Sequence, residues 1–262
     1  MFSYDFSIKD LEYFLLLLTR IGCFVGTAPF FSMNNVPARA KIGFSILLAS
    51  LAYIAIVPHT DPEYYTILGY FFLVLKEALC GVCIGFVANL SMYVLQFAGS
   101  NIDRDIGLAM VSIFDPMTRQ QTGFSGSLYQ YAFMLILMIT NLHHYILKAF
   151  FEGFTLIPIG SVQLPGDNLI KVMTGYIMDA FIIAFRIYLP IYATMLLLNS
   201  VLGILAKVAP QMNMFSVGVQ LKIIVGFTAL IVTTSLIPVM SGMIASEMKR
   251  MITNVIEVIS TG

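Results

Sequence analysis

The sequence predicts an all-α, polytopic membrane protein with about six apolar helices. Of its 262 residues, 59% are hydrophobic and only 11% are charged, against about 25% charged residues in an ordinary soluble domain. The charges are spaced so that several uncharged stretches reach the roughly 20 residues that a membrane-crossing helix needs. The segments between them are short and half apolar. We therefore expect a single helical membrane domain over residues 1–262.

The expected helices follow one another along the chain. Separate strands would leave backbone groups without partners in lipid, and no stretch shows the strict alternation of a barrel strand. Residues 133–140 (FMLILMIT) are apolar on every side, which is typical of a helix surrounded by lipid or by other proteins. The expected helices are residues 21–38, 42–60, 78–102, 120–147, 187–206 and 223–246.

The charge balance excludes one class of partner and leaves the topology open. The 14 Lys and Arg residues balance the 14 Asp and Glu residues, so the chain lacks the basic excess that neutralises the phosphates of DNA or RNA. Simple alternation of the expected helices places six basic side chains on one side and five on the other, so the positive-inside rule does not choose an orientation. Either a crossing is misplaced, for example within 174–206, where Pro190 could kink the chain, or the helices do not cross in simple alternation.

Five charged residues fall inside apolar segments, where each costs about 2.5–3.5 kcal/mol at the centre of a spanning helix. Neighbouring charges at positions 76 and 77 point about 100° apart on a helix and do not neutralise each other. We expect partners on other helices or other chains, or side chains that reach the interface from a helix end. The five are Arg20, Lys76, Glu77, Asp179 and Arg186.

Two glycine pairs predict close helix packing. Gly22 and Gly26, and likewise Gly81 and Gly85, are four residues apart and share a helix face. Without side chains on that face, a neighbouring backbone can approach closely.

One motif is shared with intramembrane serine proteases. Residues 123–126 (GFSG) reproduce their GxSG string, and His143 and His144 follow. If Ser125 and His143 share a helix, they are 18 residues apart, which is about 27 Å along the axis. A nucleophile and its base could not meet at that distance, so we expect no enzyme.

No metal or cofactor site is expected. Cys80 and Cys83 form a single CxxC inside an apolar helix, without the further ligands of a tetrahedral zinc site. The adjacent His143 and His144 lack the spacing that directs two ligands to one metal.

Two irregular segments stand out between the apolar stretches. In residues 101–123, the charged cluster Asp103-Arg104-Asp105 and Gly107 precede an apolar run (109–114, AMVSIF) that is broken by Asp115-Pro116, because Pro116 disfavours helix. This apolar run could sit in a cavity as a lid or plug. The second segment is a polar, Met-rich turn with Pro210, Gln211, Met212, Asn213 and Phe215. Irregular polar backbone at membrane depth is tolerated only where protein buries it or water reaches it, so we expect this turn in such a place.

The sequence resembles the FliR family of flagellar biosynthesis proteins and its SctT-type relatives in virulence type III secretion. The resemblance extends from about residue 10 to 250, and a Gly-His pair of the family is replaced here by Leu142-His143-His144. The blocks that carry it are Pro29 with Val36-Pro37-x-Arg39, Asp105-x-Gly107 with Phe114-Asp115-Pro116, Leu198-x-x-x-Leu202-Gly203-x-Leu205-Ala206, and Pro210-Gln211-Met212-Asn213-x-Phe215 with Lys222.

The resemblance implies a subunit of the type III protein export gate in the bacterial inner membrane, within the flagellar basal body. Its implied partners are FliP-type and FliQ-type gate subunits, FlhB-type and FlhA-type export components, membrane lipid and unfolded proteins in transit. The resemblance also implies that the helices form tilted hairpins in the gate. The turn at 210–215 would lie at a subunit contact or pore entrance. The family's plug maps to residues 105–122, which gives as gating residues Asp105, Ile106, Gly107, Met110, Ile113, Phe114, Asp115 and Pro116.

A secondary transporter of a small solute is the alternative function. It predicts internal repeats with interrupted helices in matching halves, and no convincing repeat is present. The motifs favour a flagellar system over a virulence system without deciding between them.

Overall fold

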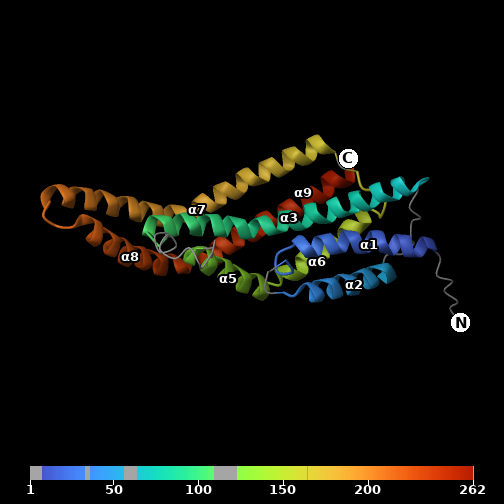
Figure 1. Ribbon diagram of the computed structural model, residues 1–262, viewed down its shortest axis with the longest axis horizontal. Helices are drawn as coiled ribbons and strands as arrows, with labels where there is room; N and C mark the ends of the chain where they lie inside the picture. Colours follow the sequence, from blue (N-terminus) through green and yellow to red (C-terminus); the bar gives the residue numbers. More distant parts are fainter. Residues whose placement is uncertain (1–7, 33–35, 56–63, 109–122, 164, 262) are drawn as a thin grey trace. The chain divides into compact units, whose positions relative to one another are not determined.

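The structure is a computed structural model that describes residues 8–32, 36–55, 64–108, 123–163 and 165–261. These residues form helices and short connections without a β-strand, which confirms the predicted all-α class (Figure 1). In chain order the helices are α1 (Ile8–Thr27), α2 (Ala38–Ala55), α3 (Ile67–Ile106), α5 (Phe124–Ile139), α6 (Leu142–Leu156), α7 (Gly166–Val208), α8 (Met214–Thr233), the 3-10 turn η2 (Thr234–Leu236) and α9 (Ile237–Thr261).

Several of the described segments are long and apolar enough to cross a membrane, which confirms the polytopic prediction. Four helical segments qualify by themselves, and the pair α5 and α6, bent by 72°, adds a fifth if the two helices form one broken span. The sequence predicted about six. The four are Ala38–Ala55, Ile67–Ile106, Gly166–Val208 and Phe215–Ser260.

Helix boundaries explain the difference from the expected segments. Residues 21–38 are not one helix, because α1 begins at Ile8 and ends at Thr27. Residues 120–147 are divided at Asn141, whose φ of 55° lies in the left-handed region and interrupts a right-handed helix. In contrast, α7 continues through Pro190, so no helix boundary falls there.

The lengths of α3 and α7 bear on the topology. They contain 40 and 43 residues. At about 1.5 Å per residue, each is about 60 Å long, roughly twice the thickness of the hydrocarbon core. These lengths favour helices that are tilted or extend beyond the core over simple alternation.

The chain forms two compact units, and α3, α7 and α9 contribute to both. Unit 1 comprises Met1–Leu90, Asn141–Tyr176 and Glu247–Gly262, and unit 2 comprises Ser91–Thr140 and Ile177–Ser246. Each unit has buried side chains of its own.

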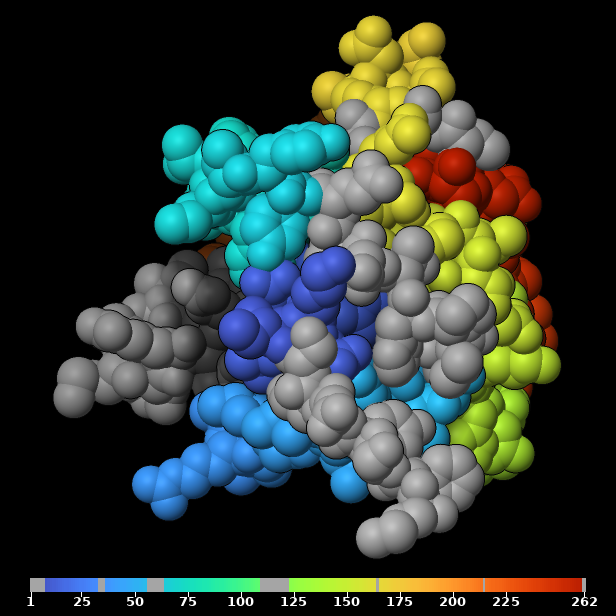
Figure 2. Space-filling model, turned by 90° about the vertical axis from the view of Figure 1, so that its right-hand side faces the viewer, coloured from blue at the N-terminus to red at the C-terminus, as the bar shows by residue number. Residues whose placement is uncertain are grey.

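Helix α1 lies at the centre of unit 1 and contributes much of its core. Figure 2 shows α1 with α2, α3 and α6 around it. On α1, Leu16, Leu17 and Ile21 are fully buried. Phe24 stacks on Phe150 of α6, with ring centroids 3.9 Å apart. Burial of these large side chains is the main stabilising contribution to such a core.

In unit 2, α7 and α8 form a hairpin (Figure 1). The end of α3 packs on both helices, because a Cβ at Gly226 of α8 would lie 2.6 Å from Ile106 and 2.7 Å from Met195. On the other part of α7, Phe181 contacts Phe97 of α3 edge to face.

Candidate functional site

A buried ion pair joins α1 to α3 in unit 1. Arg20 is 2% exposed, Glu77 is 0% exposed, and Arg20 Nε lies 2.5 Å from Glu77 Oε2. Arg20 also donates to the carbonyl oxygen of Ile157 at 2.7 Å, and the Gly160 N–H donates to Glu77 Oε1 at 2.8 Å. The Arg20 guanidinium lies 4.8 Å from the ring centroid of Phe154. Both charges are therefore compensated, and they hold the α6–α7 connection against α1 and α3.

The five charges predicted inside apolar segments do not form one group. Arg20 and Glu77, listed with the charges for partner contacts, pair with each other on two helices of the same chain, which is the first of the two kinds of partner that the sequence predicted. Lys76 and Arg186 are exposed on this chain and Asp179 is half-buried. Glu77 is turned inward while Lys76 is turned outward, as expected for successive residues of a helix.

The glycine pair on α3 lies where α3 approaches α1 most closely. A Cβ at Gly81 would overlap the carbonyl oxygen of Arg20, and a Cβ at Gly85 would overlap the Thr27 side chain. Only glycine allows this backbone approach.

The glycine pair on α1 behaves differently. A Cβ at Gly22 or Gly26 would meet no atom within 4 Å in the part of the chain that the structure describes. The expected close packing is therefore absent at these two positions among the described residues.

The end of α3 has a defined geometry, at the start of the segment predicted as a plug. Gly107 has a φ of 93°, and its N–H lies 3.1 Å from the Asp103 carbonyl oxygen and 3.2 Å from that of Arg104. This left-handed glycine is a common helix C-cap. Ile106 is fully buried, and Tyr188 of α7 donates a hydrogen bond to Asp105.

The last turn of α3 also holds the start of α5. The Asp103 carboxylate accepts hydrogen bonds from the Ser125 N–H at 3.1 Å and from the Ser125 hydroxyl at 2.6 Å. Gly123, the N-cap residue of α5, has no side chain, and a Cβ there would overlap Asp103. Asp103 thus supplies from another helix the acceptor that an N-cap side chain normally provides. We call this pair the Asp103–Ser125 clamp.

A close backbone contact lies beside the clamp. A Cβ at Gly99 of α3 would overlap the backbone nitrogen and Cα of Gly126 in α5. The clamp and this contact bring the two ends of the 107–123 connection together.

The other predicted gating residues lie within 109–122, outside the residues that the structure describes. They are Met110, Ile113, Phe114, Asp115 and Pro116.

The clamp gives a first testable prediction. Asp103→Ala removes the acceptor for the Ser125 N–H, and loss of such a cap costs about 0.5–2 kcal/mol. We expect faster hydrogen exchange at the start of α5 and a lower unfolding temperature. Asp103→Asn retains an acceptor oxygen and should behave close to wild type. Equal exchange in Asp103→Ala and wild type would contradict the clamp.

The predicted polar turn connects α7 to α8. Residues 210–213 and Phe215 are exposed. Asn213 is the N-cap of α8, and its side chain accepts from the Ser216 N–H at 3.4 Å. This turn is ordered by its cap, and it leaves Pro210, Gln211, Met212 and Phe215 available on the surface.

The motifs considered for catalysis or metal binding do not build a site. The Ser125 hydroxyl is engaged by Asp103. Cys23, Cys80 and Cys83 are free thiols, and among the described residues no three His, Cys, Asp or Glu side chains are grouped to hold a metal.

Helices of this length and apolarity, with a compensated buried ion pair, define a multi-pass helical membrane protein. Residues 11–251 match the sequence profile described as "Bacterial export proteins, family 1". The chain therefore belongs to this family of bacterial export proteins, and within it to the FliR family of flagellar biosynthetic proteins.

Three relatives show the extent of the similarity, and each is a flagellar biosynthetic protein FliR. The Bacillus subtilis protein is 36% identical, over 88% of this chain and 90% of the relative. The Aquifex aeolicus protein is 30% identical over 86% of each chain. The Escherichia coli protein is 25% identical over 91% of this chain and 90% of the relative. The chain accordingly has a role in flagellar protein export and is a multi-pass protein of the bacterial inner membrane.

The roles of Asp103 and Ser125 were missed by the sequence interpretation. Asp103 was noted only as part of a charged cluster, and Ser125 only within a protease-like string. A signal was present, because Gly123 leaves α5 without a local side-chain cap. Nothing in the sequence indicated that the missing acceptor would come from α3.

Proposed function

We propose that this chain is a non-enzymatic subunit that forms and seals the protein-conducting channel of the flagellar export gate. FliP-type and FliQ-type subunits are its proposed neighbours, FlhB-type and FlhA-type components act with them, and unfolded flagellar proteins are the cargo. We treat residues 1–262 as a single membrane domain built from two compact units.

The observation that supports the sealing role is the Asp103–Ser125 clamp. It joins the last turn of α3 to the first turn of α5, so the two ends of the connection between these helices lie next to each other. The apolar run of this connection from Ala109 to Phe114 is suited to fill an apolar constriction, where burial stabilises it.

The surface of the chain supports a role as one subunit among several. Along α7 and α8 many large apolar side chains are exposed, including Leu197 at 67% and Ile231 at 73%. Lipid or other subunits must cover this surface in the membrane. Gly22, Gly26 and the exposed charges Lys76 and Arg186 are proposed contacts with other subunits, together with half-buried Asp179 and the turn at 210–215.

Deleting residues 109–114 tests the sealing role. We expect the gate complex to assemble with its partners and to conduct small ions in the resting state, because the apolar closing segment is missing. The measurement is ion flux through the purified complex in lipid vesicles. As a control, a Ser/Gly segment of the same length should also leak, since it restores length without apolar contacts. Conductance equal to that of wild type in the assembled complex would show that sealing lies elsewhere.

A further inference from the structure

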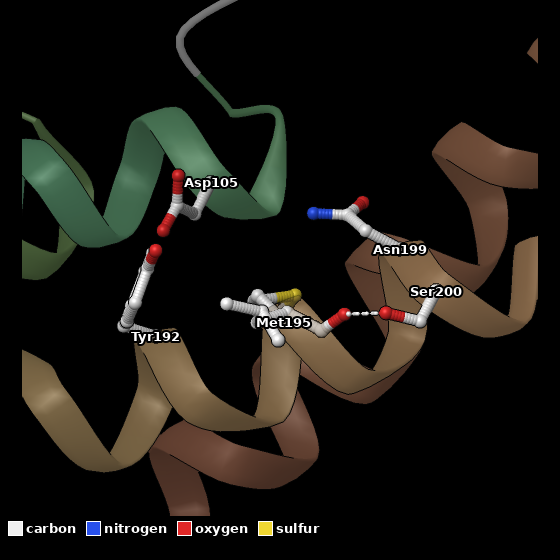
Figure 3. A pocket seen from close by; sticks show the side chains of 6 residues that line it. Asp105, Tyr192, Met195, Asn199 and Ser200 are labelled. Atoms are coloured by element: carbon white, nitrogen blue, oxygen red, sulfur yellow. Dashed lines mark hydrogen bonds between the residues drawn. The ribbon is translucent and has the colours of Figure 1, made fainter. Parts of the chain in front are cut away.

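A pocket with both polar and apolar lining residues lies between the end of α3 and the middle of α7, within unit 2. Its volume is about 330 Å³, and Asp105 forms one wall. Figure 3 shows the side chains of Asp105 and Asn199 directed to the space between the two helices, with Met195 beneath it. The remaining lining residues are Tyr192, Leu196 and Ser200.

The chemistry of the pocket favours a cationic group. An ionised carboxylate only accepts hydrogen bonds and has about four acceptor positions. Tyr188 donates one bond to Asp105. The Ser200 hydroxyl donates its proton to the Leu196 carbonyl at 2.9 Å, which leaves its oxygen as an acceptor. A ligand that only donates, such as an ammonium or guanidinium group, is complementary to the Asp105 carboxylate and the Ser200 oxygen, and the Asn199 amide can offer its oxygen to the same ligand.

The surroundings make such a partner necessary. Leu189, Leu197 and Val201 of α7 are exposed large apolar residues on either side of the pocket along the helix. Once lipid or protein covers this apolar surface, an uncompensated carboxylate costs several kcal/mol, and such charges are usually paired. Among the described residues, no basic side chain lies within ion-pair distance of Asp105.

We propose that the pocket formed by Asp105, Tyr192, Met195, Leu196, Asn199 and Ser200 receives a Lys or Arg side chain from an apolar helix of a neighbouring subunit. The apolar stem of that side chain lies along Met195 and Leu196, and its charged end reaches Asp105, as long basic side chains commonly do. A lipid ammonium fits less well, because the lipids that carry one also carry a phosphate, whose negative charge would lie beside Asp105. This inference rests on the proposed function as a subunit of a larger complex.

The test is co-purification of the gate complex in mild detergent with Asp105→Asn and Asp105→Lys. Truncating one member of a buried charge pair between subunits costs at least about 2 kcal/mol, so we expect roughly thirtyfold or greater weakening with Asp105→Asn and a larger loss with Asp105→Lys. Asp167→Lys, at an exposed carboxylate in the first turn of α7, is the matched control and should leave the complex intact. Restoration of the Asp105→Lys complex by a Lys→Glu or Arg→Glu change in one partner helix would identify the occupant.

Each outcome has a separate meaning. If wild type does not co-purify with other membrane subunits, the proposed function itself fails. If wild type does and Asp105→Asn assembles equally well, the proposed function stands and the pocket assignment is overturned. An effect of Asp105→Asn that appears only in bilayers containing phosphatidylethanolamine would assign the pocket to lipid and overturn the assignment to a subunit. Asp105→Asn keeps the shape of the side chain, and an unchanged unfolding temperature of the variant separates lost contact from lost folding.

Discussion

Glu77→Ala is expected to destabilise the protein by about 3–5 kcal/mol, because it leaves the buried Arg20 guanidinium without its counter-charge. The pair is completely enclosed, and Glu77 also accepts from the Gly160 N–H, so the substitution frees the α6–α7 connection as well. We expect little full-length protein in the membrane and a clearly lower unfolding temperature for what is recovered. Thermal unfolding of the purified chain provides the measurement.

An exposed ion pair in the same unit supplies the control. Lys148 and Glu152 lie 3.6 Å apart, with side chains 74% and 64% exposed, and a pair of this kind contributes about 0–1 kcal/mol. Glu152→Ala should therefore have little effect. The double variant Arg20→Met with Glu77→Leu should recover much of the stability lost in Glu77→Ala, because an apolar pair of similar volume leaves no isolated charge. Equal stability of Glu77→Ala and Glu152→Ala would contradict the role assigned to the buried pair.

Gly81→Ala is expected to have the next largest effect. Its new methyl group would overlap the backbone carbonyl oxygen of Arg20, and a backbone atom cannot move aside as the end of a side chain can. Overpacking of this kind costs about 1–3 kcal/mol. Because the clash lies beside the Arg20–Glu77 pair, we expect that pair to be disturbed too.

The second glycine pair gives an internal comparison for this prediction. Gly22→Ala introduces the same methyl group into open space in the described part of the chain, and alanine stabilises a helix relative to glycine by about 0.5–1 kcal/mol. The isolated chain should therefore be unchanged or slightly more stable. If Gly22→Ala nevertheless disrupts the assembled complex, the α1 glycines contact another subunit. Equal thermal stability of both variants as isolated chains would contradict the close α1–α3 approach.

Much of the fold was predictable because its causes are local. The low charge and long apolar stretches predicted helices in a membrane, because backbone N–H and C=O groups in lipid must find hydrogen-bond partners within the same segment. The boundaries were less predictable. Segments defined by their lack of charge do not show that Asn141 adopts a left-handed conformation, or that a helix continues through Pro190.

The candidate site divides in the same way. Asp105 and Gly107 were recognised because they interrupt the apolar sequence and belong to the family motifs, and the structure places both at the end of α3. The pairing of Arg20 with Glu77 was not predictable, since the two are 57 residues apart and any of several charges could have been the partner.

The sequence by itself determined that this chain is a helical membrane protein of the bacterial export family, because composition, apolar segment length and motif order are properties of the chain alone. Only the tertiary structure decided which charges are compensated, which glycines are covered and how the base of the 107–123 connection is closed. Those outcomes depend on which helix faces meet. Of two identical GxxxG patterns, the one on α3 meets the backbone of α1, and the one on α1 meets no atom of the described residues.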